Sequence, residues 1–188
     1  MANRKEQIVE TAAELLQTRV FSAFSYQDIA DRLGITKAAI HSHYRTKEML
    51  GIALLEGTIG YLKEMHFNIE ESTDSSWDRF NAYVENTANM VFEENKICPV
   101  CVLQAEHNVI PESMQKGVSH VYNYNREWMA KILKQGRDKG DMIFNGTPED
   151  QALLVMATIQ GAIMSARAEN PETFRNTIEQ LKNTMKPV

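Results

Sequence analysis

The sequence predicts an all-α fold of about nine helices. Apolar residues recur at intervals of three and four positions along most of the chain, as Ile8, Ala12 and Leu15 do near the N-terminus. No segment alternates apolar and polar residues between turn signals, as a half-buried strand does. Capping residues followed by Pro or by acidic residues divide the pattern into segments, and such signals mark helix starts.

The composition is that of a folded protein that does not enter a membrane. Of 188 residues, 43% are hydrophobic and 24% are charged, and the formal net charge is −5. No apolar run approaches the ~20 residues that a membrane span needs, and the N-terminus lacks the apolar core of a secretory signal. Two cysteines three positions apart do not form a secreted disulfide framework. We therefore expect a cytoplasmic protein.

Four helices are expected in the first part of the chain. Their ranges are 3–19, 26–33, 36–43 and 46–68. Ser25 caps the second helix and pairs with Asp28 in a capping box, while Gly34 supplies the corner that follows it. Thr36 and Thr46 are the expected caps of the third and fourth helices.

Five further helices are expected after a polar loop at residues 70–76. Their approximate ranges are 77–94, 99–107, 112–139, 147–169 and 171–185. Pro99 and Pro111 interrupt the pattern because proline lacks an amide donor and restricts the residue before it. Thr147 and Asn170 are each followed by a proline and an acidic residue, which is the usual order at a helix start.

Residues 25–47 have the spacing of a helix-turn-helix. Ala30 is small where the first helix passes closest to the second, Gly34 permits a positive φ at the corner, and Ile40 packs back from the second helix. The outward positions of the second helix are small, polar or basic, which suits close approach to the DNA major groove. Residues 1–48 hold seven Lys and Arg against six acids, whereas the remainder is acidic. This stretch predicts binding to double-stranded operator DNA.

The same residues resemble the TetR family of transcriptional regulators. The resemblance rests on SYQDIA, GIT, AIHSHY and TKEML, and it covers about residues 8–55. It implies a DNA-binding domain at residues 1–48 and a ligand-sensing and dimerisation domain at 49–188. It also implies DNA contacts from matching positions. These are Ser25, Thr36, Lys37, Ala38, Ala39, His41 and Lys47.

The last two predicted helices favour a homodimer. Ala157, Gly161 and Ser165 form a stripe of small residues that permits close helix approach. Phe174, Ile178 and Leu181 repeat at intervals of four and three, as along a helical seam. Such helices could instead only cover the core. The resemblance favours a two-fold interface of four helices between two copies.

Aromatic and methionine residues between positions 65 and 129 suit a pocket for a small apolar molecule. Most single aromatic residues at helical spacing belong to a core, so these residues alone do not establish a pocket. The resemblance implies one, and it predicts a small-molecule inducer of unknown identity. The candidate lining residues are Met65, Phe80, Tyr83, Cys98, Cys101, His107, Tyr124 and Trp128.

Cys98 and Cys101 allow three interpretations. They lie at a helix start, whose positive end lowers a thiol pKa and favours redox or electrophile sensing. The segment CPVCVLQAE resembles a subgroup of TetR regulators in which the cysteine at the position of Cys98 responds to electrophiles and oxidants. The two residues could instead be small buried hydrophobes, which is the commoner role. Zinc is disfavoured because only His107 lies near enough in sequence to add a ligand.

An enzyme is not indicated, and neither a cofactor nor a metal site is expected. The sequence shows no Ser-His-Asp order, no phosphate-binding Gly loop and no metal-binding His pair. Glu106, His107 and Glu112 could form an acid–base site, but scattered His and Glu occur in any helical protein. The prediction is a dimeric, ligand-responsive repressor; an activator and a helical interaction module are the alternatives.

Overall fold

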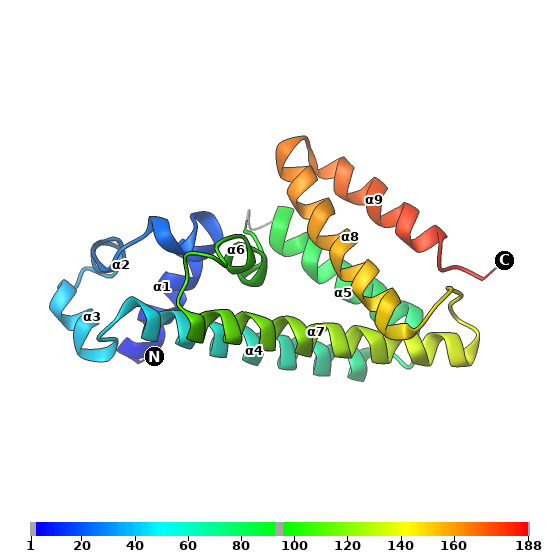
Figure 1. The fold of residues 1–188 in the computed structure, drawn as a ribbon, viewed down its shortest axis with the longest axis horizontal. Coiled ribbons are helices and arrows are strands. Elements are labelled where there is room, and N and C mark those ends of the chain that lie inside the picture. Colours follow the sequence, from blue (N-terminus) through cyan, green and yellow to red (C-terminus); the bar gives the residue numbers. More distant parts are fainter. Residues whose placement is uncertain (1–2, 93–95, 188) are drawn as a thin grey trace. The chain divides into compact units, whose positions relative to one another are not determined.

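The computed structural model describes residues 3–92 and 96–187. Within these residues the chain forms nine α-helices and one short 3-10 helix, and no strand (Figure 1). The elements are α1 (Arg4–Thr18), η1 (Phe21–Ala23), α2 (Tyr26–Leu33), α3 (Lys37–His43), α4 (Lys47–Ser72), α5 (Ser76–Phe92), α6 (Pro99–Ala105), α7 (Glu112–Lys139), α8 (Pro148–Ala168) and α9 (Pro171–Asn183). The all-α prediction is confirmed.

The five predicted caps, at Ser25, Thr36, Thr46, Thr147 and Asn170, are present. The Ser25 side chain accepts the N–H of Asp28, and the Asp28 carboxylate accepts the N–H of Ser25, which completes the predicted capping box. Thr36 and Thr147 each accept an amide N–H three residues on. Such caps each contribute about 1 kcal/mol because they satisfy amides that a helix leaves unpaired.

Three boundaries differ from the sequence prediction by two residues or more, and one of them is the end of α6, which lies at Ala105 instead of residue 107. The fourth helix extends to Ser72, so part of the segment expected to be a loop is helical, and Ser75 caps α5 by accepting the N–H of Asp78 over 3.2 Å. Helix α9 ends at Asn183, two residues earlier than expected. The predicted end of the fifth helix, at residue 94, lies outside the described residues. None of the helices in the described part is long and apolar enough to cross a bilayer.

The chain folds as two compact units. The first comprises residues 1–61 and 95–122, and the second comprises residues 62–94 and 123–188. Helices α4 and α7 therefore contribute residues to both. The division differs from the domain boundary at residue 48 that the sequence analysis predicts, which concerns function and stays a prediction.

Each unit has its own core. In the first unit α1 packs against α2 and α6, and Ile8, Leu15 and Ile29 are fully buried. In the second unit α8 and α9 form a closely packed pair, visible in orange and red in Figure 1, and Phe174 is buried with Ile163. Burial of such side chains is the main contribution to the stability of each unit.

Candidate nucleic-acid interface

Helices α2 and α3 form a helix-turn-helix. Gly34 ends α2 with φ of +63° and ψ of +36°, a left-handed conformation that glycine adopts without a Cβ clash. Ala30 and Ile40 are fully buried, as the predicted close packing of the two helices requires. The Tyr26 hydroxyl donates to the Tyr44 carbonyl over 2.9 Å and ties the start of α2 to the end of α3.

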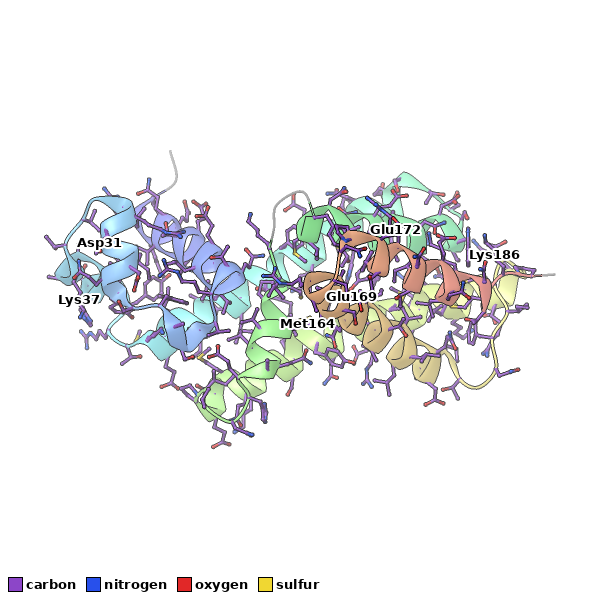
Figure 2. All side chains as sticks on the ribbon, turned by 90° about the horizontal axis from the view of Figure 1, so that it is seen from above. Asp31, Lys37, Met164, Glu169, Glu172 and Lys186 are labelled. Atoms are coloured by element: carbon purple, nitrogen blue, oxygen red, sulfur yellow. The ribbon has the colours of Figure 1, made fainter. Side chains whose placement is uncertain are left out.

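The outer face of α3 presents small and basic side chains to solvent. Lys37 and Ala38 are exposed, whereas Ala39 is half-buried. Lys37 stands on the first turn of α3 and projects from the ribbon (Figure 2). A helix with this face has no bulky side chain to keep it from the floor of a DNA groove. Lys37 and Ala38 are therefore accessible for the contacts with DNA that the sequence predicts.

Three other predicted DNA contacts already have a partner within the protein. Ser25 and Thr36 are exposed caps of α2 and α3. The exposed His41 ring lies 4.7 Å from the Tyr26 ring at 65°, centroid to centroid, in an edge-on contact. Its Nδ1 also lies 3.4 Å from the Arg45 carbonyl oxygen. The contact of His41 with DNA stays a prediction.

Lys47 has partners within the protein. Its ammonium group donates to the backbone carbonyls of Phe21 and Phe24, and it lies 4.5 Å and 4.3 Å from the centres of their rings. Partial burial lowers the pKa of Lys47, while the negative charge of Glu106 opposes that shift. Lys47 thus holds the connector between α1 and α2 in place, and its contact with a DNA phosphate stays a prediction.

Glu106 is a structural residue that sequence reasoning missed. This buried carboxylate follows the last turn of α6 and accepts the N–H of Phe21 over 2.6 Å and the N–H of Ser22 over 3.0 Å. The Ser22 hydroxyl donates to it as well. Glu106 and Lys47 therefore hold the same connector from two sides. The contact joins residues more than eighty positions apart, so no local pattern signals it.

The two cysteines lie at the start of α6. Cys98 is the N-cap residue and Cys101 is on the first turn, and neither forms a disulfide. A hydrogen bond from the Cys101 thiol lowers the pKa of Cys98 to about 7, assisted by the backbone N–H groups of Val100 and Cys101 and opposed by burial. The Ile97 N–H donates to the Gln17 carbonyl over 3.2 Å, which ties this end of α6 to α1.

The eight candidate residues for the ligand pocket are divided between the two units. Cys98, Cys101 and the exposed His107 belong to the first unit, whereas the remaining five belong to the second. Among these five, Tyr83 and Trp128 are buried with ring centres 5.7 Å apart. Phe80 is fully buried, and Met65 and Tyr124 are half-buried. Their role as a ligand pocket stays a prediction.

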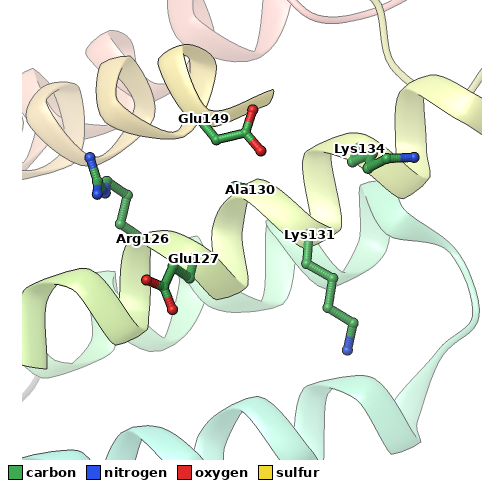
Figure 3. Close-up of a pocket in the computed structure, with 6 residues that line it drawn as sticks. All are labelled: Arg126, Glu127, Ala130, Lys131, Lys134 and Glu149. Carbon is green, nitrogen blue, oxygen red and sulfur yellow. The ribbon is translucent and has the colours of Figure 1, made fainter. Parts of the chain in front are cut away.

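The second unit also has two surface depressions. One, of about 260 Å³, is lined by charged residues of α7 and by Glu149 on the first turn of α8 (Figure 3). Its α7 residues are Arg126, Glu127, Ala130, Lys131 and Lys134. The other, of about 480 Å³, lies around Phe144 and Gln151. None of the predicted ligand residues lines either depression.

The residues of the predicted dimer interface are exposed on α8 and buried on α9. Ala157, Gly161 and Ser165 are exposed on α8, and the large exposed side chains of Leu153, Leu154 and Met164 lie on the same helix (Figure 2 labels Met164). Phe174, Ile178 and Leu181 are instead buried at 2%, 2% and 6% exposure. They are packed inside their own unit, and their place in a dimer interface stays a prediction.

The imagined acid–base site does not form. The Glu106 carboxylate accepts hydrogen bonds from the α1–α2 connector, and Glu112 pairs with Lys116 over 2.7 Å on the surface of α7. His107 is exposed, and its carbonyl accepts from Gln115. Among residues 3–92 and 96–187, no three His, Cys, Asp or Glu side chains converge into a metal-binding set.

Comparison with known proteins agrees with the helix-turn-helix geometry. Residues 8–54 match the family model of bacterial regulatory proteins of the tetR family. The chain is 24% identical over 183 residues to the HTH-type transcriptional repressor NemR of Escherichia coli K12, which covers 95% of this chain and 92% of that protein. It is 25% identical over 141 residues to the repressor KstR2 of Mycobacterium tuberculosis, covering 73% of this chain and 68% of that protein.

Solved structures share the fold. A TetR-family regulator from Agrobacterium tumefaciens superposes with a TM-score of 0.91 at 26% identity, over 96% of each chain. The reduced form of Escherichia coli NemR superposes with a TM-score of 0.87 at 22% identity, over 99% of this chain and all of that one.

Proposed function

Because the chain belongs to the TetR family of bacterial transcriptional regulators, we propose that it is a homodimeric repressor that binds operator DNA through α3 and releases it when an effector acts. The observation that carries this proposal is the outer face of α3. Lys37 and Ala38 are exposed there, while Ile40 on the opposite face is fully buried against α2. This arrangement supports a reader of the major groove.

Two copies are part of the proposal. One short helix makes too few base contacts to select an operator, so modules of this kind act in pairs on two half-sites. Exposed apolar residues on α8, including Leu153, Leu154 and Met164, support a partner surface around the stripe of small residues. The relatives are regulators rather than enzymes, which supports a non-catalytic protein acting on DNA in the cytoplasm.

Release through α6 is the second half of the proposal. The N-terminus of α6 carries the reactive pair Cys98 and Cys101, and its C-terminal end carries Glu106, which holds the connector into α2. A modified thiol at one end of this seven-residue helix would shift the helix and with it Glu106 at the other end. Because Glu106 binds the connector into α2, the shift would reach the helix-turn-helix within the same unit. A small-molecule effector that prefers the shifted conformation would act on the same element.

The proposal is tested by selecting bound sequences from a pool of random DNA duplexes. A two-fold symmetric site is expected, with half-sites about one helical turn apart. The affinity for that site should fall steeply with salt, because phosphate contacts release counterions. Recovery of no preferred sequence contradicts the proposal. A reporter gene behind the selected site distinguishes repression, which is expected, from activation.

A further inference from the structure

The second unit contains a buried histidine inside a group of aromatic rings. His66 on α4 is 3% exposed, and its ring lies parallel to that of Trp128 with centres 4.0 Å apart and a 4° angle between planes. Tyr124 stacks with the same imidazole at 5.5 Å, and Tyr83 lies 6.4 Å away. We call His66, Tyr83, Tyr124 and Trp128 the aromatic cluster.

Hydrogen bonds within the cluster determine which nitrogen of His66 carries the proton. The Asn125 amide nitrogen donates to the Tyr83 hydroxyl over 2.7 Å, so its oxygen is the atom that faces His66. That oxygen lies 2.9 Å from His66 Nε2 and can only accept, so Nε2 carries a proton. Burial lowers the pKa of His66 to about 4, which keeps the imidazole neutral at pH 7. Nδ1 therefore presents a lone pair.

Nδ1 has no hydrogen-bond partner within the protein. It is one of three buried side-chain polar atoms in the described residues that lack a partner, and it is the only one in the aromatic cluster. A buried acceptor without a partner costs about 1–3 kcal/mol, so a donor that reaches it gains that free energy on binding. The other polar groups nearby are occupied, since the Trp128 N–H and the Lys131 ammonium both donate to Glu70.

We propose that His66 Nδ1 accepts a hydrogen bond from the effector, and that the effector is an uncharged, flat, apolar molecule with one hydroxyl or N–H donor. This inference rests on the proposed ligand response. Aromatic rings favour a flat molecule, and a lone pair on a neutral imidazole selects a donor and repels a carboxylate. His66, Tyr83 and Trp128 are buried, so binding requires their side chains to repack. Met156, whose sulfur lies 3.7 Å from the Tyr83 hydroxyl, is the flexible side chain at its edge.

Binding of 1-naphthol and 1-methoxynaphthalene to the full-length protein without DNA tests the proposal. The two probes have the same rings, but only the first can donate. We expect tryptophan fluorescence to report at least about ten-fold tighter binding of 1-naphthol, the difference that one hydrogen bond of ~1.4 kcal/mol makes. His66→Phe should abolish this preference, while the exposed control His120→Phe should retain it.

A second measurement needs no variant. In the ¹⁵N-labelled wild-type protein, the unprotonated Nδ1 signal of His66 should shift with 1-naphthol and stay in place with 1-methoxynaphthalene. Equal affinity for both probes, binding of neither, or a preference that survives in His66→Phe overturns the inference. None of these results bears on operator binding. The proposed function fails separately, if no DNA sequence is selected.

Discussion

The carboxylate of Glu106 accepts the backbone N–H of Phe21 over 2.6 Å, and so joins the end of α6 to the segment that enters the helix-turn-helix. Lys47 donates to the carbonyl of the same Phe21. An anion and a cation therefore hold opposite ends of one residue's backbone. Because each charge is satisfied partly by the connector, we expect a shift of α6 to act on the connector first and on α3 through it.

Loss of the negative charge at position 106 should loosen this connection. Glu106→Gln keeps the shape of the side chain, but its amide nitrogen cannot accept the second N–H, and Lys47 loses its compensating charge. We expect a loss of about 1–3 kcal/mol in the free energy of unfolding, measured by urea denaturation. The matched control is Glu10→Gln on the exposed face of α1, which should change stability by less than about 0.5 kcal/mol. Equal effects of the two changes would contradict the structural role of Glu106.

Substitutions of Lys37 and of Lys47 should have different effects on DNA binding and on stability. Lys37→Ala removes an exposed charge from α3, so the dependence of log affinity on log salt should become less steep by about 2 for a dimer, with stability unchanged. Lys47→Met removes donors to two carbonyls, so it should cost about 1–2 kcal/mol of stability and leave the salt slope unchanged. The measurements are salt titrations of operator binding and urea denaturation. If the folded Lys47→Met protein shows a reduced salt slope, Lys47 contacts a DNA phosphate in the complex.

The difference between these two lysines also shows what the sequence could predict. The caps Ser25 and Thr36, the Gly34 corner and the buried Ile40 follow from local spacing, and the sequence predicted them. The direction of Lys47 and the partner of Glu106 depend on chain segments brought together only by the fold, so no local pattern carries them. Apolar spacing likewise predicted that Phe174 and Ile178 are buried, but it cannot tell whether their own unit or a second copy covers them.

A side chain at the corner of the helix-turn-helix should destabilise the protein. A Cβ at Gly34 would meet no atom within 4 Å, so the cost of Gly34→Ala comes only from the positive φ of +63°. We expect a loss of about 1–2 kcal/mol in urea denaturation. Gly57→Ala is the matched control, because this helical glycine of α4 also has open space around it. It should stabilise the protein by about 0.5–1 kcal/mol. A loss of stability in both variants would show that the backbone conformation of Gly34 is not the cause.

Thiol reactivity should report the environment of Cys98. Because the pKa of Cys98 is lowered to about 7, the rate of alkylation by iodoacetamide should rise with pH and level off above about pH 7. An ordinary thiol levels off above about pH 8.5. Cys101→Ala removes the donating thiol, so the inflection should move to higher pH, and Cys98→Ser identifies the reacting residue. Alkylation that leaves operator affinity unchanged would contradict release through α6.

The exposed stripe on α8 should be the partner surface. A Cβ at Gly161 would meet no atom within 4 Å, so Gly161→Arg should leave the protomer folded while placing a charge on the stripe. We expect the dimer dissociation constant to rise about ten-fold or more in sedimentation equilibrium, because an unpaired charge at an apolar interface must be desolvated. Gly60→Arg on α4 is the matched control, since this glycine is also helical and exposed with open space. A dimer weakened by Gly60→Arg but not by Gly161→Arg would place the interface elsewhere, and operator binding that survives as a monomer would contradict the paired half-sites.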